Sequence, residues 1–243
     1  MVTMIHTAVI MAAGLGTRFG KRTEKIPKGF IPAGGKPMVV RSIETLLSCG
    51  ITRIIIGTGF GREAYEALSD RFPGIECVFS PRYAETNSMY TLYNCREVIG
   101  DDDFLLLESD IIYNRPAITG LLEDEHPDIM LITPVTKFQD QYYVAHDAEG
   151  WLVDCSTNKD AIEAQGELVG IHKLSSGFYK SLCRDYASKS EEFPKLGYEY
   201  ELLHMSQHVI PMFVLNSGQA RWYEIDDEAD LNYAEKHIVP FLD

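Results

Sequence analysis

Short apolar runs alternate with longer amphipathic stretches over the first half of the chain. The runs are rich in β-branched side chains and predict strands over residues 7–11, 53–57, 75–79, 104–108 and 129–134. The stretches between and after them predict helices over residues 37–48, 62–71, 88–98 and 116–122. Runs such as IIIG and FLLLES are apolar at nearly every position, so these strands are expected to be buried on both faces. The pattern predicts an α/β fold with a Rossmann-like, mostly parallel sheet flanked by helices.

The second half of the chain, after about residue 140, has shorter segments in which apolar and polar positions alternate. These segments are YYVAHD, GWLVDCS, ELVGIHKL, PMFVLN and RWYEID. Helices are predicted over residues 176–188, 198–206 and 228–238. We expect antiparallel strands added to the same sheet, or a small lid, because no linker rich in Pro, Gly or Ser separates the halves. The expectation is therefore a single domain over residues 1–243.

The composition is that of an ordinary globular protein, with 45% hydrophobic and 24% charged residues. A net charge of −14 argues against binding to nucleic acid or to an anionic membrane surface. The apolar stretches are far shorter than the roughly 20 residues of a membrane span, and the N-terminus has no basic region typical of a signal peptide. Five scattered cysteines form no CxxC pair, which disfavours a zinc site or a disulfide framework. These features predict a cytoplasmic protein.

Positive charge is concentrated near the N-terminus. Residues 1–42 hold seven basic side chains and one acidic side chain, a pattern that suits a small polyanion. The first predicted strand runs into MAAGLGTRFGKR, and glycines at a strand-to-helix turn let backbone N–H groups approach an anion. Gly14, Gly16 and Gly20 are spaced GxGxxxG, one residue too long for the dinucleotide-binding GxGxxG. A Walker A loop is also excluded, because Leu15 stands where its first glycine is needed.

The continuation of this turn resembles the nucleotidyltransferase superfamily of the sugar-nucleotide type. The residues that carry the resemblance are Gly14, Gly16, Thr17, Arg18, Pro27, Lys28, Lys36 and Pro37. The resemblance implies that the loop wraps a nucleoside triphosphate and that Arg18 and Lys28 are catalytic residues at its phosphates. It places the nucleotide-binding positions at Ala12, Ala13, Gly14, Gly16 and Thr17. Phosphoryl transfer rests mainly on positioning and charge neutralisation, which agrees with a cationic loop; the alternative is a solvated basic loop.

Two acidic positions mark the end of one of the predicted buried strands. The run FLLLESD places Glu108 and Asp110 at the carboxyl edge of the sheet, where α/β proteins bind ligands. In the superfamily the aspartate that closes this strand is a metal ligand, and Asp110 matches it. Glu108 lies two positions earlier on the same strand face and is expected to help place the acceptor. The implied cofactor is Mg²⁺, held by carboxylates together with phosphate oxygens and water; solvated or helix-capping carboxylates are the alternative.

The second metal carboxylate of the superfamily is expected in WYEIDDEADLNYAEK. Asp226 matches it, and Asp227 then becomes the N-cap of the following helix with Asp230 at N3, although the two adjacent aspartates could exchange roles. A further catalytic residue, Lys159, stands in a strand–turn–lysine–strand arrangement. It resembles the superfamily's lysine for the phosphoryl group of the acceptor, and an exposed loop lysine is an equally good explanation.

Nearly the whole chain resembles the branch of small cytidylyltransferases that act on 2-aminoethylphosphonate or phosphocholine, and it resembles the phosphonate enzymes most. The branch implies CTP as the donor, with Asn87 and Ser88 against its base. It also implies an acceptor-binding segment in KLGYEYELL. Within that segment we expect Tyr198 and Glu201 to bind the acceptor, because residues three apart share a helix face. A tyrosine-rich helix that only packs on the sheet is the alternative.

The expected reaction is transfer of CMP from CTP to a small zwitterionic phosphonate, 2-aminoethylphosphonate, with release of pyrophosphate. Phosphocholine is the second candidate acceptor, because acidic and aromatic residues are both present; sugar 1-phosphates are more remote. An NAD-linked dehydrogenase is disfavoured by the broken GxGxxG, and a non-catalytic nucleotide sensor by the retained basic and acidic positions. The sequence is compatible with a homodimer or with fusion to a transaminase module.

Overall fold

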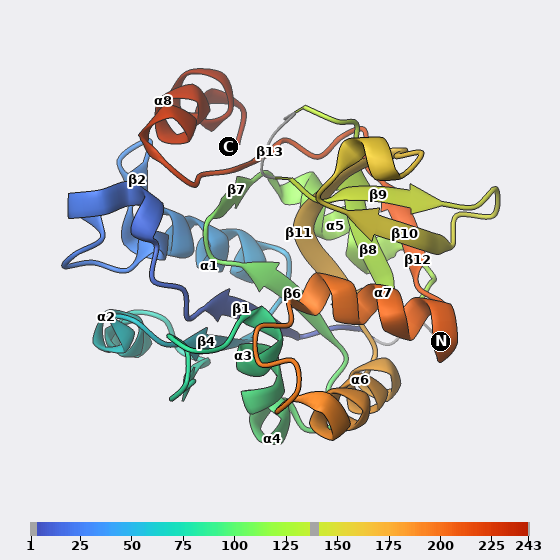
Figure 1. Cartoon of the computed structure of the whole chain (residues 1–243). Helices are drawn as coiled ribbons and strands as arrows, with labels where there is room; N and C mark the ends of the chain where they lie inside the picture. Colours follow the sequence, from blue (N-terminus) through green and yellow to red (C-terminus); the bar gives the residue numbers. More distant parts are fainter. Residues whose placement is uncertain (1–3, 137–140, 243) are drawn as a thin grey trace.

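A mixed sheet of nine strands runs through residues 4–136 and 141–242, the part of the chain that this computed structural model describes (Figure 1). Its strands are β1 (Thr7–Ala12), β4 (Arg53–Thr58), β5 (Ile75–Phe79), β6 (Phe104–Glu108), β8 (Ile129–Thr133), β9 (Tyr143–His146), β10 (Leu152–Ser156), β11 (Gly166–Leu174) and β12 (Phe213–Asn216). The order β5-β4-β1-β6 is parallel throughout. The predicted parallel core is therefore confirmed.

The C-terminal half extends this sheet mainly with antiparallel strands. Strand β11 is antiparallel to β6 and β8, and β9 and β10 form an antiparallel pair beside its start. Strand β12 differs from the prediction, because it pairs with β8 in parallel. Alternation of apolar and polar positions reports one solvated face and carries no information on strand direction. Two further two-stranded pieces lie outside this sheet: β7 (Ile111–Tyr113) with β13 (Trp222–Glu224), and β2 (Pro32–Ala33) with β3 (Lys36–Pro37).

The described helices cover both faces of the sheet. The α-helices are α1 (Met38–Ser48), α2 (Arg62–Glu66), α3 (Ser88–Asn94), α4 (Arg96–Ile99), α5 (Arg115–Glu123), α6 (Ser176–Lys189), α7 (Tyr198–His208) and α8 (Glu228–His237). The 3₁₀ helices are η1 (Thr17–Arg22), η2 (Lys28–Phe30), η3 (Ala67–Asp70), η4 (Lys159–Ala161) and η5 (Val239–Phe241). None of the described helices has the length and apolar character that crossing a bilayer requires.

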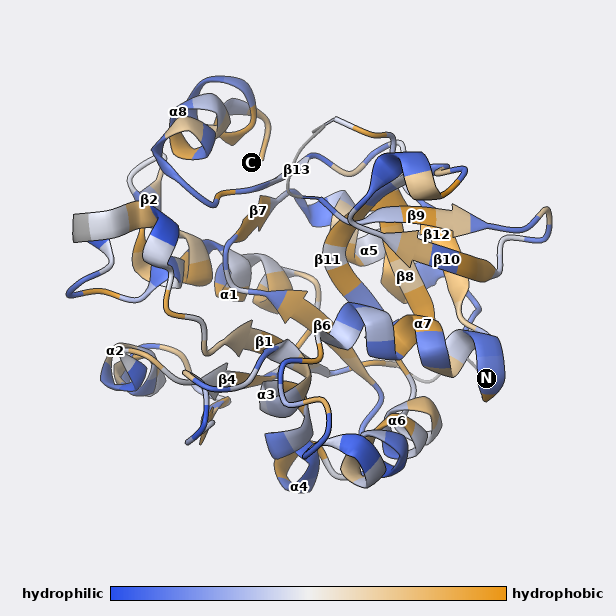
Figure 2. Cartoon of the chain, in the orientation of Figure 1, coloured by the Kyte–Doolittle hydropathy of each residue, from blue (hydrophilic) through white to orange (hydrophobic). Residues whose placement is uncertain are grey.

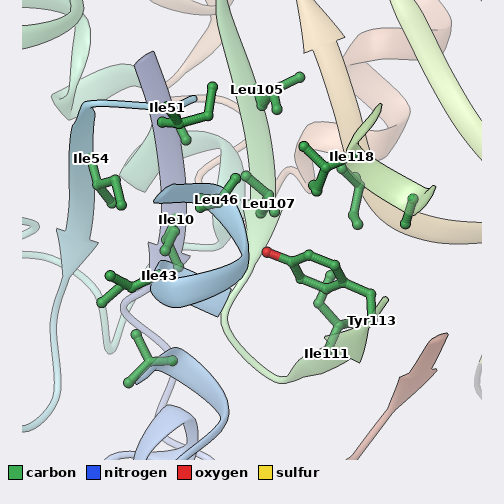
Figure 3. Close-up of a cluster of buried hydrophobic side chains, with 14 of the residues drawn as sticks. Ile10, Ile43, Leu46, Ile51, Ile54, Leu105, Leu107, Ile111, Tyr113 and Ile118 are labelled. Carbon is green, nitrogen blue, oxygen red and sulfur yellow. The ribbon is translucent and has the colours of Figure 1, made fainter. Parts of the chain in front are cut away.

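Alternate residues of the central strands enter two separate cores. Ile10 of β1 belongs to a cluster with α1, α2 and α5, whereas its neighbour Val9 belongs to a cluster with α3, α6 and α7. Figure 3 shows the first cluster, in which Ile43 and Leu46 of α1 lie close to Ile10. The central strands are accordingly apolar over most of their length, and the helices carry both polar and apolar residues (Figure 2). Burial on both faces explains the continuous apolar runs in the sequence.

The predicted helix over residues 88–98 is interrupted at Cys95. The Sγ of Cys95 donates to the carbonyl of Thr91 over 3.4 Å, and the backbone N–H of Cys95 bonds to Leu92 instead. A side chain that competes for the i−4 carbonyl in this way breaks the helical ladder. The predicted helix over 62–71 likewise tightens into a 3₁₀ turn, η3, after α2.

Candidate active site

A cavity of about 470 Å³ opens at the carboxyl ends of β1 and β6. Met11 of β1 is in register with Glu108 of β6, so the loops that follow the two strands leave the sheet side by side. The cavity is also lined by the starts of α3 and α7. It has the size and the position at the sheet edge that are typical of ligand sites in α/β proteins. Most of the predicted site residues line it: Ala12, Ala13, Gly14, Gly16, Thr17, Arg18, Lys28, Asn87, Ser88, Glu108, Asp110, Tyr198 and Asp226.

The glycine-rich loop is shaped by close packing at Gly16. Gly16 has a φ of +63° and precedes η1, and a Cβ at this position would lie 3.0 Å from the Cβ of Lys28. The hydroxyl of Thr23 donates to the carbonyl of Gly16 over 2.8 Å. A left-handed conformation with so little space favours glycine. The loop therefore folds tightly against the segment that carries Lys28.

Lys28 joins the two predicted metal carboxylates. Its Nζ lies 2.5 Å from Oδ2 of Asp110 and 2.5 Å from Oδ1 of Asp226, so these two oxygens are at most twice that distance apart. Arg18 contacts the same Oδ1 of Asp226 over 2.7 Å. Burial opposes the charge of Lys28, but the two carboxylates outweigh it and raise the pKa of Lys28 above its ordinary value. The basic loop and both aspartates thus meet at one place.

The side chains of the adjacent residues Asp226 and Asp227 have different partners: Asp226 contacts Lys28, and Asp227 caps α8. The side chain of Asp227 accepts the backbone N–H groups of Ala229 and Asp230 and caps α8. Asp226 is buried against Lys28, and its own N–H donates to Asp230 over 3.0 Å. The backbone N–H of Ile225 donates to the carbonyl of Asp110 over 2.9 Å, which fixes this segment beside the end of β6. The geometry favours Asp226 over Asp227 as the carboxylate of the cavity.

Glu224 is a cavity residue that the sequence interpretation missed. It lies opposite Ile111 in the β7–β13 ribbon, and its carboxylate oxygen lies within 4.8 Å of oxygens from Glu108 and Asp110. Oxygens bound to one octahedral Mg²⁺ are about 3–4 Å apart, so small side-chain rotations would bring these groups to a shared ion. A signal was present in the sequence: each of the two segments carries two acids separated by one residue, Glu108 with Asp110 and Glu224 with Asp226.

These oxygen donors fit Mg²⁺, which prefers carboxylates and leaves other positions to phosphate oxygens and water. The residues that would hold the ion are Asp110 with Asp226, or Asp110 with Glu224. The ammonium of Lys28 stands between Asp110 and Asp226 in this structure. Mg²⁺ bound to both of these carboxylates would therefore require Lys28 to move.

Glu108 is held in a dedicated recess. The hydroxyl of Tyr198 donates to its Oε1 over 2.7 Å, and Gly170 leaves room for the other side of the carboxyl group. Gly170 has a φ of +75°, and a Cβ there would lie 2.9 Å from Oε2 of Glu108. Burial first, and then the charges of Asp110, Glu224 and Glu199, raise the pKa of Glu108 well above its ordinary value. The position of this carboxyl group is thus set by the fold.

At the start of α7 it is Glu199, and not the expected Glu201, that lines the cavity. Glu199 lines the cavity, whereas the carboxylate of Glu201 lies 2.8 Å from Nζ of Lys189 on α6. The expectation that Glu201 shares the acceptor site with Tyr198 is therefore corrected. Tyr198 and Glu201 are both buried, but they face different neighbours. Glu199 reaches the cavity because its side chain folds back over Gly197, where a Cβ would clash with the carboxylate.

Of three other predicted site residues, Asn87 and Ser88 line the cavity and Lys159 does not. Asn87 caps α3 and donates from Nδ2 to the carbonyl of Lys195 over 3.3 Å. Ser88 accepts the backbone N–H of Tyr198 over 3.0 Å and so ties the start of α3 to the start of α7. Lys159 is exposed in η4 and does not line the cavity. The structure therefore does not bring Lys159 to Arg18 and Lys28.

Known proteins with similar sequences include cytidylyltransferases. The chain is 32% identical over 182 residues to the 2-aminoethylphosphonate cytidylyltransferase of Lancefieldella rimae, covering 74% of this chain and 66% of that protein. It is 38% identical over 104 residues to the choline-phosphate cytidylyltransferase of Streptococcus pneumoniae, covering 40% and 45%. Both matches span less than two thirds of the relative's length.

Solved structures agree on the fold. The inositol-1-phosphate CTP transferase from T. maritima superposes with a TM-score of 0.81 at 18% identity, covering 98% of this chain and 99% of that one. At this identity the superposition establishes the architecture alone. The MobA-like NTP transferase domain matches residues 8–177 of the sequence, and the chain therefore belongs to that family.

Proposed function

We propose that the protein is a Mg²⁺-dependent cytidylyltransferase that transfers CMP from CTP to 2-aminoethylphosphonate and releases pyrophosphate. The observation that carries the proposal is the meeting of Lys28 and Arg18 with Asp110 and Asp226 at the mouth of a glycine-rich loop. A triphosphate with its divalent cation requires positive and carboxylate groups at the same place. The cytidylyltransferases among the sequence relatives support the choice of donor.

The proposed reaction needs no protein nucleophile. An oxygen of the acceptor's phosphonate attacks the α-phosphorus of CTP, a new P–O bond forms, and the bond from the α-phosphorus to the bridging oxygen of pyrophosphate breaks. Arg18 and Lys28 would bind the phosphates and neutralise charge that moves onto the leaving group. Bound Mg²⁺ would supply Lewis-acid activation of the phosphate. The glycine-rich loop would hold the nucleotide in line with the acceptor.

Phosphocholine remains a second candidate acceptor, because one of the relatives is a choline-phosphate cytidylyltransferase. Both acceptors combine an anionic group with a cationic tail. Glu108 and Tyr198 are the proposed acceptor residues, since their hydrogen-bonded pair lines the cavity. Lys159 stays a prediction for the anionic end of the acceptor.

The decisive test is pyrophosphate release from each of four nucleoside triphosphates, with 2-aminoethylphosphonate, phosphocholine or glucose 1-phosphate as acceptor. We expect release with CTP and 2-aminoethylphosphonate, and none when EDTA removes the metal. Preference for UTP with glucose 1-phosphate would contradict the proposal. Release of pyrophosphate without a CMP-linked product, as observed by mass spectrometry, would also contradict it.

A further inference from the structure

The cavity is lined by carboxyl groups in addition to the two aspartates that Lys28 contacts. Glu108, Glu224 and Glu199 contribute these carboxyl groups, while Arg18 and Lys28 contact Asp226 and Asp110. We propose that Glu199 binds the ammonium group of the acceptor and restricts the enzyme to primary amines. This inference rests on the proposed function and goes beyond it, because it assigns the choice of acceptor to one residue.

Glu199 is buried, and one of its two carboxylate oxygens lacks a hydrogen-bond partner within the described residues. It is only 6% exposed, and its Oε2 has no hydrogen-bond partner within the described residues. The carboxylate accepts a bond from its own backbone N–H, and burial raises its pKa to about 7. Buried polar groups in native proteins are nearly always paired, so an unpaired carboxylate oxygen in a residue that lines a cavity points to a ligand group. A cationic N–H donor is the partner that would satisfy it best.

Glu108 and Glu224 add two further carboxyl groups to the lining of the cavity. The charges of Glu199 and Glu224 both contribute to the raised pKa of Glu108, so the three groups lie within electrostatic reach of one another. Two of these carboxyl groups already accept hydrogen bonds: Nε2 of Gln141 donates to Glu224 over 3.1 Å, and the hydroxyl of Tyr198 donates to Glu108 over 2.7 Å. A primary ammonium brings three N–H donors and one positive charge to the remaining oxygens.

The aromatic side chains near these carboxyl groups are poorly placed to form a cage for a trimethylammonium group. The ring of Tyr198 is fully buried and packs edge-on against His172, with centroids 5.4 Å apart, so that its hydroxyl contacts Glu108. The ring of Tyr142 packs edge-on against Tyr200. A trimethylammonium group prefers aromatic faces and has no N–H to donate. It would leave Oε2 of Glu199 unpaired.

The basic side chains and the unpaired carboxyl group of Glu199 therefore favour one orientation of a bound zwitterion. The anionic group of the acceptor lies toward Arg18 and Lys28, where the nucleotide phosphates are expected, and the amine lies toward Glu199. An inverted acceptor would place its phosphonate among carboxylates, which like-charge repulsion disfavours. The fixed orientation presents the attacking oxygen to the nucleotide.

The first test uses the wild-type protein with CTP and a series of acceptors: 2-aminoethylphosphonate and its N-methyl, N,N-dimethyl and N,N,N-trimethyl derivatives. We expect kcat/KM to fall with methylation and to be at least about 100-fold lower for the trimethyl compound, because a site built for N–H donors rejects an analogue that lacks them. Equal use of the four acceptors would overturn the inference and leave the proposed function intact. Absence of CMP transfer to any acceptor would refute the proposed function itself.

The second test compares Glu199→Gln with Glu201→Gln. The two changes are isosteric and lie two residues apart on α7, but the carboxylate of Glu201 contacts Lys189 instead of lining the cavity. We expect Glu199→Gln to raise KM for 2-aminoethylphosphonate at least about tenfold and to reduce the discrimination against the trimethyl compound. KM for CTP is expected to stay within about twofold. Equal effects of the two variants, or equal losses for CTP and acceptor, would overturn the assignment, and thermal unfolding of each variant checks that it is folded.

Discussion

Lys28 and Asp226 are separated by 198 positions in the sequence and meet through a contact of 2.5 Å. The same ammonium lies 2.5 Å from Asp110, and all three side chains are largely withdrawn from water. A lysine that joins two carboxylates from distant segments neutralises charges that would otherwise repel one another. It also stands where the proposed metal and phosphates must come together.

Replacement of Lys28 tests this relationship. We expect Lys28→Met to lower the turnover of CMP transfer at least about 100-fold, because a phosphate-binding charge is lost. The variant is also expected to be less stable by roughly 2–3 kcal/mol in urea unfolding, since the buried Asp226 and the partly buried Asp110 lose their shared partner while Arg18 still contacts Asp226. Lys25→Met is the matched control, because Lys25 is exposed and does not line the cavity. Similar kinetics for the two variants would remove Lys28 from the site.

Substitution of Asp226 is expected to affect activity, whereas substitution of the adjacent Asp227 is expected to affect stability. Asp226→Ala is expected to reduce kcat at least about 100-fold, because a proposed metal ligand is lost. Asp227→Ala removes the N-cap of α8 and should lower the free energy of unfolding by about 1 kcal/mol with little change in kcat. Steady-state kinetics and chemical unfolding of both variants provide the measurement. A reversal of the two effects would identify Asp227 as the ligand.

The sequence predicted the parallel core well because burial dominates its pattern. The bounds of β6 match the prediction, since an apolar run between polar residues defines where a doubly buried strand begins and ends. The predicted antiparallel pairing of β12 was wrong. The direction in which a strand pairs depends on the path of the chain through α6 and α7 and not on the residues of the strand. Cys95 interrupts a helix through one side-chain bond that no periodicity reveals.

The site residues that belong to one contiguous sequence motif could be predicted. Those whose position depends on how helices and strands pack could not. The loop around Arg18 and the aspartates at strand ends were recognisable from local sequence. The contribution of Glu199 was not, because the rotation of α7 is set by Tyr198 and Leu202, which pack into one of the cores. Glu224 depends on the pairing of β13 with β7, two short strands that are far apart in the sequence.

Gly170 should report on how precisely Glu108 must be placed. Gly170→Ala puts a Cβ 2.9 Å from the carboxylate of Glu108 and forces alanine into a φ of +75°, so it is expected to lower stability by roughly 1–2 kcal/mol and to raise KM for the acceptor. Gly50→Ala is the control for backbone strain alone, because Gly50 has a φ of +90° and nothing within 4 Å of a Cβ. Kinetics with CTP and 2-aminoethylphosphonate distinguish the two variants. If Gly50→Ala raised KM for the acceptor equally, the contact with Glu108 would not be the cause.

His172 should make the folded protein sensitive to mild acid. It is fully buried in β11, neither ring nitrogen has a hydrogen-bond partner within the described residues, and burial lowers its pKa to about 3. The unfolded chain binds a proton near pH 6.5, whereas the folded chain does not until about pH 3, so the contribution of His172 to stability is complete above pH 6.5 and is lost as the pH falls toward 3.

The expected slope is roughly 1.4 kcal/mol per pH unit below pH 6. His172→Phe removes this proton uptake. The unfolding free energy at about pH 7 minus that at about pH 5 should therefore be smaller in the variant than in the wild type. This comparison does not depend on the absolute stability of the variant. Urea unfolding at the two pH values measures it. An unchanged difference would mean that His172 already takes up its proton in the folded protein at about pH 5. Asp128 and Glu201 cannot replace it as the cause, because burial raises the pKa of both carboxyl groups and so favours the folded state as the pH falls.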